Sequence, residues 1–216
     1  MSSSEAPQRP LRVDAERNRQ RILTAAATLF AERGVDVSID DIAAAAGVGI
    51  GTLYRRFPDR EALIEALFED KVARIAKLAS DALEIEDPRE AFLTFFRGAA
   101  RMQAEDRGLK EVLLGDRGHE RVATIRNTIR PIAIQLVQRA QDAGALRADL
   151  DPFDVPMMQV AMSAVADITR DVAPAYWERL LTIFLDGLAR DRAGTAPMTA
   201  PPLGVEQFTT AMSRRR

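Results

Sequence analysis

Side chains capable of catalysis are scarce in this sequence. It holds no cysteine, which excludes disulfides, thiolate metal ligands and cysteine nucleophiles. The one histidine, His119, stands beside Glu120 at a predicted helix start, where a surface or capping role is more usual than a ligand contact. A single histidine forms no histidine metal cluster and argues against a Ser-His-Asp triad. With no acid–base pair or phosphate loop either, we expect no enzyme, no metal and no cofactor.

Hydrogen-bonding chemistry is concentrated in residues 38–57, SIDDIAAAAGVGIGTLYRRF. On a helical wheel of about 100° per residue, Leu53 and Phe57 share one side. The far side carries small, hydroxyl and cationic residues, with a phenol and a second cation on its flanks: Gly51, Thr52 and Arg55, then Tyr54 and Arg56. Such a layout is typical of a helix that enters the major groove of DNA. The alternative is an ordinary helical hairpin in a helical core.

The elements that must position these residues are two short helices. Ser38 is a good N-cap for the first, which ends near Ala46 because Gly47 can adopt the left-handed conformation. The second begins after Gly49 and ends near Phe57, before a proline. A helix over 14–33 precedes this helix-turn-helix, and a long helix starting after Asp59 follows it. Further helices are predicted at 88–105, 108–115, 119–143 (kinked at Pro131), 152–171 and 174–191.

This pattern predicts an all-α fold with four regions. We expect a disordered basic arm at 1–13, a DNA-binding domain at 14–60, a larger helical regulatory and dimerisation domain at 61–191, and a disordered tail at 192–216. The whole chain has 30 basic and 32 acidic residues, but residues 9–21 hold five arginines against two acidic residues. Residues 61–191 hold 17 basic and 23 acidic groups. Only the N-terminal part therefore suits a phosphate backbone. With no stretch apolar enough for a membrane span and no signal-peptide core, a cytoplasmic protein is expected.

The stretch from Arg17 to Phe68, including RILTAAATLFAERGVDVSIDDIAAAAGVGIGTLYRRFPDREALIEALF, resembles the DNA-binding module of the TetR family of transcriptional repressors. The resemblance implies an all-α homodimer whose three N-terminal helices bind a palindromic operator on double-stranded DNA. It also implies a larger C-terminal domain with a pocket for a small-molecule effector. The last two long helices of each subunit would form a four-helix dimer interface.

Carried over by position, Thr52 resembles the family's base contact and Tyr54 its contact to phosphate and methyl groups. Arg56 stands where histidine is common, and Arg60 where a phosphate-binding lysine is common. Two positions depart from the family, because Gly49 replaces the usual serine cap and Ile50 replaces a frequent lysine; which bases are read is left open. Together with Arg17 from the basic segment at 9–21, the expected DNA contacts are Arg17, Ser38, Ile50, Gly51, Thr52, Tyr54, Arg55, Arg56 and Arg60.

The C-terminal half offers candidates for two further surfaces. Large apolar residues that could line an effector pocket, with plain core packing as the alternative, are Phe92, Phe96, Met102, Ile125, Ile129, Met158 and Met162. A wide apolar stripe on 174–191 and small residues on the preceding helix predict the dimer interface, the alternative being packing within the chain. Its expected residues are Val160, Ala164, Ile168, Trp177, Leu181, Phe184, Leu185 and Leu188.

The leading hypothesis is a repressor that a small molecule releases from its operator. A ligand-independent dimeric DNA-binding protein, or an activator whose C-terminal domain serves only dimerisation or partner docking, is the alternative. The effector, the operator sequence, the regulated genes and the number of dimers on an operator stay open.

Overall fold

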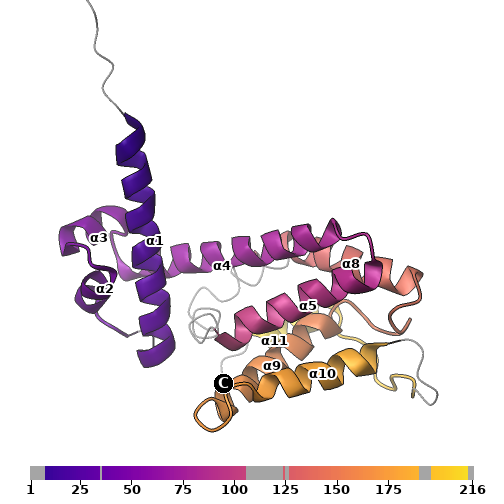
Figure 1. The fold of residues 1–216 in the computed structure, drawn as a ribbon. Coiled ribbons are helices and arrows are strands. Elements are labelled where there is room, and N and C mark those ends of the chain that lie inside the picture. Colours follow the sequence, from indigo (N-terminus) through magenta and orange to yellow (C-terminus); the bar gives the residue numbers. More distant parts are fainter. Residues whose placement is uncertain (1–7, 35, 106–123, 125–126, 190–195, 214–216) are drawn as a thin grey trace, which may run out of the picture. The chain divides into compact units, whose positions relative to one another are not determined.

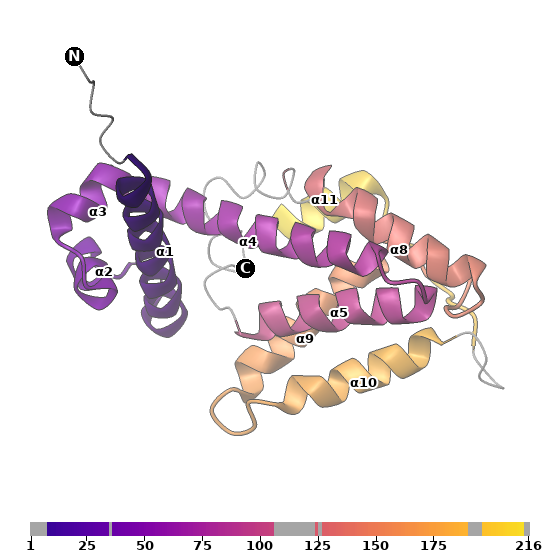
Figure 2. The same ribbon diagram turned by 45° about the horizontal axis from the view of Figure 1, so that its top comes forward.

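The computed structural model describes residues 8–34, 36–105, 124, 127–189 and 196–213. Within these ranges every named secondary-structure element is an α-helix, which confirms the all-α prediction (Figures 1 and 2). The chain divides into two compact units between Glu69 and Asp70. The first holds α1 (Gln8–Arg33), α2 (Ile39–Ala46), α3 (Ile50–Arg56) and the start of α4 (Arg60–Leu83). The second holds the rest of α4, then α5 (Pro88–Glu105), α8 (Arg130–Asp142), α9 (Asp154–Thr169), α10 (Tyr176–Leu188) and α11 (Val205–Ser213).

The first unit is built around apolar residues from each of its helices. Fully or almost fully buried are Ile22, Ala26 and Phe30 of α1, Ile42 of α2, Leu53 of α3 and Leu63 of α4. Burying such side chains contributes on the order of 1.5–3 kcal/mol each, so this core holds the short α2 and α3, which are too short to be stable alone. α1 begins at Gln8, six residues before the predicted start. Pro10 does not prevent this, because the first-turn N–H groups of a helix have no partner within it.

The second unit packs α9 against both α5 and α10, and α5 also against α8. Phe92 and Phe96 of α5 stack with ring centroids 5.6 Å apart. The predicted helix over 119–143 lies partly outside the described residues: Thr124, Asn127 and Thr128 are helical, and α8 runs from Arg130 to Asp142 with Pro131 in its first turn. Proline is compatible with this place because its fixed φ suits the first turn of a helix. The predicted helix at 108–115 lies outside the described residues.

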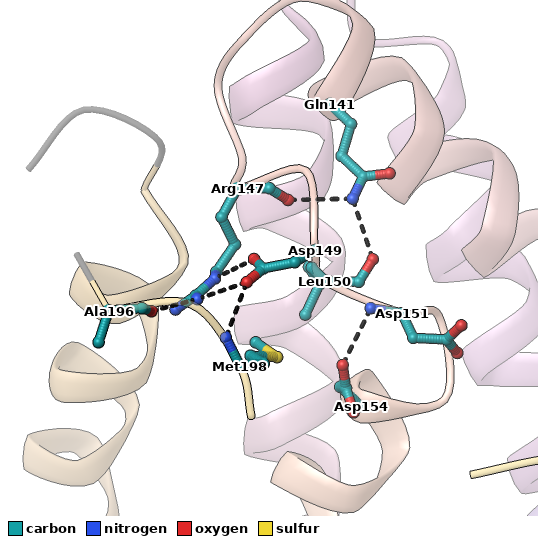
Figure 3. Close-up of polar contacts among 8 residues, drawn as sticks. All are labelled: Gln141, Arg147, Asp149, Leu150, Asp151, Asp154, Ala196 and Met198. Atoms are coloured by element: carbon teal, nitrogen blue, oxygen red, sulfur yellow. Dashed lines mark hydrogen bonds and ion pairs between the residues drawn. The ribbon is translucent and has the colours of Figure 1, made fainter. Parts of the chain in front are cut away.

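The C-terminal segment returns to the second unit, which corrects the prediction of an unstructured tail from 192 onward. Residues 205–213 form α11, and Phe208 packs on Phe153 with ring centroids 4.9 Å apart. Upstream, Arg147 donates a hydrogen bond to the carbonyl of Ala196, and the Met198 N–H donates one to Asp149 (Figure 3). We call residues 196–213 the C-terminal strap. The packing of this strap could not be predicted from the sequence, because a single buried phenylalanine, Phe208, makes no periodic apolar pattern.

Candidate nucleic-acid interface

The helix-turn-helix is set by backbone conformations that its residues favour. The Ser38 hydroxyl caps α2 by accepting a hydrogen bond from the Asp41 N–H at 3.0 Å. Gly47 has a φ of +61°, the left-handed conformation that ends α2 and favours glycine. Arg21 of α1 donates from Nη2 to the Gly47 carbonyl at 3.1 Å, so α1 secures the turn. Sequence reasoning counted Arg21 only as a charge, since no local motif connects residues 26 positions apart.

Helix α3 presents its two faces as the helical wheel predicts. Leu53 is 0% exposed and Phe57 4%, whereas Ile50 is 39% and Tyr54 48% exposed. Gly51, Arg55 and Arg56 are exposed and Thr52 is half-buried. A Cβ added at Gly51 would meet nothing within 4 Å, so the chain's own packing does not require a glycine in this helix. An outward surface with small, aromatic and cationic groups is thus available to a partner.

The cations around α3 are held by neighbours within the first unit. Arg55 donates from Nη2 to the Thr52 hydroxyl at 3.1 Å. The Arg56 guanidinium lies 3.4 Å from the carboxylate of Glu16, which is 3.7 Å from Arg19. These are exposed pairs, which are worth little in stability, about 0–1 kcal/mol. Their effect is to fix where the guanidinium groups lie.

The remaining predicted DNA contacts lie in the same unit. Arg17 is exposed on α1 and pairs with Asp14 at 3.8 Å. Arg60 is half-buried at the start of α4, whose first turn is capped by the Asp59 carboxylate accepting from the Ala62 N–H at 2.7 Å. The side chains of Arg9 and Arg12 lie outside the described residues.

The predicted effector residues are mostly core. Phe92, Phe96 and Met162 are 0% exposed and Ile129 is 7% exposed. Met102 and Met158 are half-buried, while Ile125 and His119 lie outside the described residues. A polar group that the sequence analysis missed lies among them. Gln159 of α9 is 3% exposed and donates to the Phe96 carbonyl at 3.1 Å, and its Oε1 accepts no hydrogen bond within the described part of the chain. A buried amide is invisible to an analysis that looks for apolar stripes.

The predicted dimer residues separate into two sets. Val160 and Ile168 are 43% and 81% exposed, and Ala164, Phe184 and Leu185 are half-buried. Trp177, Leu181 and Leu188 are buried within the chain itself, at 4–8% exposure, which corrects their assignment to an interface. Of the stripe predicted on the last long helix, only these three residues face the chain's own core, while Phe184 and Leu185 are half-buried. The outer side of α10 instead exposes Tyr176 (50%) and Ile183 (59%), beside an open hollow of about 500 Å³ lined by Glu178, Arg179, Thr182 and Ile183.

Among the described residues, no group of three or more His, Cys, Asp or Glu side chains is placed to hold a metal ion. In the same ranges no helix combines the length and apolar character that crossing a membrane requires.

Comparison with known proteins supports one family along most of the chain. The bacterial regulatory proteins of the tetR family match residues 22–67, and the C-terminal domain of SbtR-like transcriptional regulators matches residues 87–190. An HTH-type transcriptional regulator of Staphylococcus aureus is 43% identical over 86 residues, 38% of this chain and 41% of the relative's own length. All these matches are regulators and not enzymes.

Two solved structures match over almost their full lengths. A TetR transcription regulatory protein from Mycobacterium vanbaalenii is 36% identical with a TM-score of 0.65, covering 83% of this chain and 99% of that chain. A TetR transcriptional regulator from Streptomyces coelicolor is 33% identical with a TM-score of 0.63, covering 81% and 99%. The chain therefore belongs to the TetR family of transcriptional regulators.

Proposed function

We propose that this protein binds operator DNA in the cytoplasm through α2 and α3 and represses transcription until a small molecule releases it. One observation supports this most: α3 exposes Ile50 and Tyr54 beside a glycine that the fold does not need. Residues 14–60 would be the DNA-binding domain, and residues 61–191 the regulatory and dimerisation domain.

In this proposal α3 lies in the major groove. Ile50 and Thr52 reach base edges, and Gly51 lets the helix approach closely. Tyr54 and Arg56 contact phosphates, and Arg56 exchanges the Glu16 carboxylate for a phosphate oxygen. Further phosphate contacts come from Arg17, Arg60 and the N–H groups beyond Ser38.

The second unit would pair two copies through the exposed sides of α9 and α10. Val160 and Ile168 on α9, and Tyr176 and Ile183 on α10, are large apolar side chains that packing within the chain leaves 43–81% exposed. Gly187 shares this side of α10, and a Cβ there would meet nothing within 4 Å, so a partner helix could approach closely. A two-fold dimer would place two α3 helices about 34 Å apart, or a multiple of one DNA turn, on a palindromic operator.

The effector would act within the second unit near Phe96 and Gln159. An unpaired acceptor in an apolar core costs about 1–3 kcal/mol, and a ligand donor could offset this cost. The alternative is a regulator whose second unit only dimerises, or an activator. Compounds that both raise the melting temperature and lower operator affinity would favour the effector; a broad library yielding none would favour the alternative.

The test is a salt titration of binding to the DNA upstream of the protein's own coding region. Wild type is compared with Tyr54→Ala/Arg56→Ala, with Arg89→Ala on α5 as a charge-removal control. We expect affinity to fall steeply with salt, and the double variant to lose affinity and, because only Arg56 carries charge, about one unit of the log–log salt slope. If wild type binds neither this DNA nor any fragment in a genome-wide selection better than the double variant does, the proposal is wrong.

A further inference from the structure

Arg55 is the residue of α3 that points most directly away from the core. Leu53 and Phe57 mark the buried side. At about 100° per residue, Arg55 lies about 180° from the midpoint of these two side chains. Its side chain is exposed. If α3 enters a groove, Arg55 is therefore the side chain aimed at its floor.

The Arg55 guanidinium is held one turn back along the helix. Side chains of a helix lean toward its N-terminus, and Arg55 Nη2 donates to the Thr52 hydroxyl at 3.1 Å. This bond places the guanidinium at the hydroxyl of Thr52, the third residue of α3. The cation thus lies at the first turn of α3, the part of a recognition helix that contacts base edges.

The partner of Arg55 is neutral, which distinguishes it from the next residue. Arg56 faces the Glu16 carboxylate at 3.4 Å, so its charge is partly neutralised before any partner arrives. Arg55 bonds a hydroxyl and keeps its full charge. A single bond to Thr52 uses one of the five N–H donors of the guanidinium and limits its rotation, which leaves a pre-oriented pair of donors.

The chemistry of the major groove selects one base for such a pair. Guanine presents two adjacent acceptors, O6 and N7, which match the guanidinium fork. Adenine presents a donor, N6, next to N7, and cytosine presents a donor at N4, so neither can accept both hydrogen bonds. We propose that Arg55, held in place by Thr52, reads a guanine in each half of the operator. This inference rests on the proposed DNA-binding function, and assigns Thr52 as the positioning residue of Arg55.

The experiment selects sequences from random duplex DNA with the full-length protein. We expect wild type to enrich a motif with one invariant guanine per half-site. Arg55→Met, which keeps the aliphatic stem and loses every N–H donor, should weaken binding and relax that position alone. Thr52→Val, which removes only the hydroxyl, should also relax it, and Thr52→Ser should restore it. Thr28→Val removes an exposed helix hydroxyl elsewhere in the unit and should leave the motif unchanged.

Modified bases then test the contact itself. Replacing the invariant guanine by 7-deazaguanine removes N7 and should weaken wild-type binding by about 5- to 150-fold, with little effect on Arg55→Met. Inosine keeps O6 and N7 and should bind like guanine. If wild type enriches no motif, the DNA-reading function itself fails. If it enriches a motif that Arg55→Met leaves intact, or that Thr52→Ser fails to restore, the function stands and the guanine inference is overturned.

Discussion

Replacing Gly51 by alanine should change stability and DNA binding in opposite directions. Glycine within a helix is less favourable than alanine by about 0.5–1 kcal/mol. At Gly51 no strain opposes the gain, because the new Cβ meets nothing within 4 Å. We therefore expect Gly51→Ala to stabilise the first unit by up to about 1 kcal/mol, which corresponds to roughly 2–4 °C in melting temperature for a chain of this size.

The same methyl group would project into the proposed interface with DNA. If bases approach α3 to van der Waals contact at Gly51, the helix must withdraw and lengthen its hydrogen bonds. We expect operator affinity to fall at least tenfold, which is about 1.4 kcal/mol. Unfolding would be followed by circular dichroism and binding by fluorescence anisotropy, at one salt concentration.

Thr94→Ala provides the control, because it raises helix propensity at an exposed position of α5, in the second unit. It should stabilise without changing DNA affinity. Should Gly51→Ala stabilise the protein and still bind operator as tightly as wild type, nothing approaches α3 at this position. The assignment of that surface to DNA would then be refuted.

Three further predictions concern other contacts. Ile183→Glu places a charge on the exposed side of α10 and should convert the proposed dimer to a monomer in light scattering, whereas Thr94→Glu should not. A dimer mass that Ile183→Glu leaves unchanged would exclude this side of α10 from the interface. Arg21→Met removes the hydrogen bond to the Gly47 carbonyl. It should lower the free energy of unfolding of the first unit by about 1 kcal/mol in denaturant and speed hydrogen exchange at residues 47–49. Unchanged exchange there would show that the turn does not depend on α1. The Arg147 guanidinium, helped by the Met198 N–H, holds the pKa of Asp149 below its usual range. Because the pKa of Asp149 is lower in the folded state, its ionised carboxylate stabilises the fold above the unfolded pKa of about 3.9, and this stabilisation is lost as pH falls further. Asp149→Asn should therefore lower the melting temperature at pH 7 and differ less from wild type below about pH 4. A difference that grows in acid would contradict this.

The helix-turn-helix could be predicted because its signals are local. A serine cap, a left-handed glycine and a proline stop mark α2 and α3 within twenty residues, and the periodicity assigns Leu53 and Phe57 to the core. The wheel also identified the outward side of α3. It could not show that Arg55 bonds Thr52 or that Arg56 faces Glu16, since side-chain pairing depends on rotamers and, for Glu16, on a helix 40 residues away.

The second unit was harder to predict because an apolar stripe does not say which neighbour it faces. Trp177, Leu181 and Leu188 pack into their own chain, while the surface left exposed on α10 is carried by Tyr176 and Ile183. The buried position of Gln159 could not be predicted for a related reason: the carbonyl that accepts its hydrogen bond, that of Phe96, is 63 residues away in the sequence.

The C-terminal strap has a consequence for where this protein can be cut. Asp149 and the Met198 N–H that it binds are 49 residues apart, and the segment between them contains all of α9 and α10. A shortened protein that ends where the family match ends, at residue 190, would keep Asp149 and Phe153 and lose the residues that cover them. Such a fragment would uncover the side of the Phe153 ring that Phe208 covers, while the Arg130 guanidinium, 4.2 Å from the ring centroid, would stay on it. Self-association or thermal weakness measured on it would then be a property of the cut edge and not of the natural regulator.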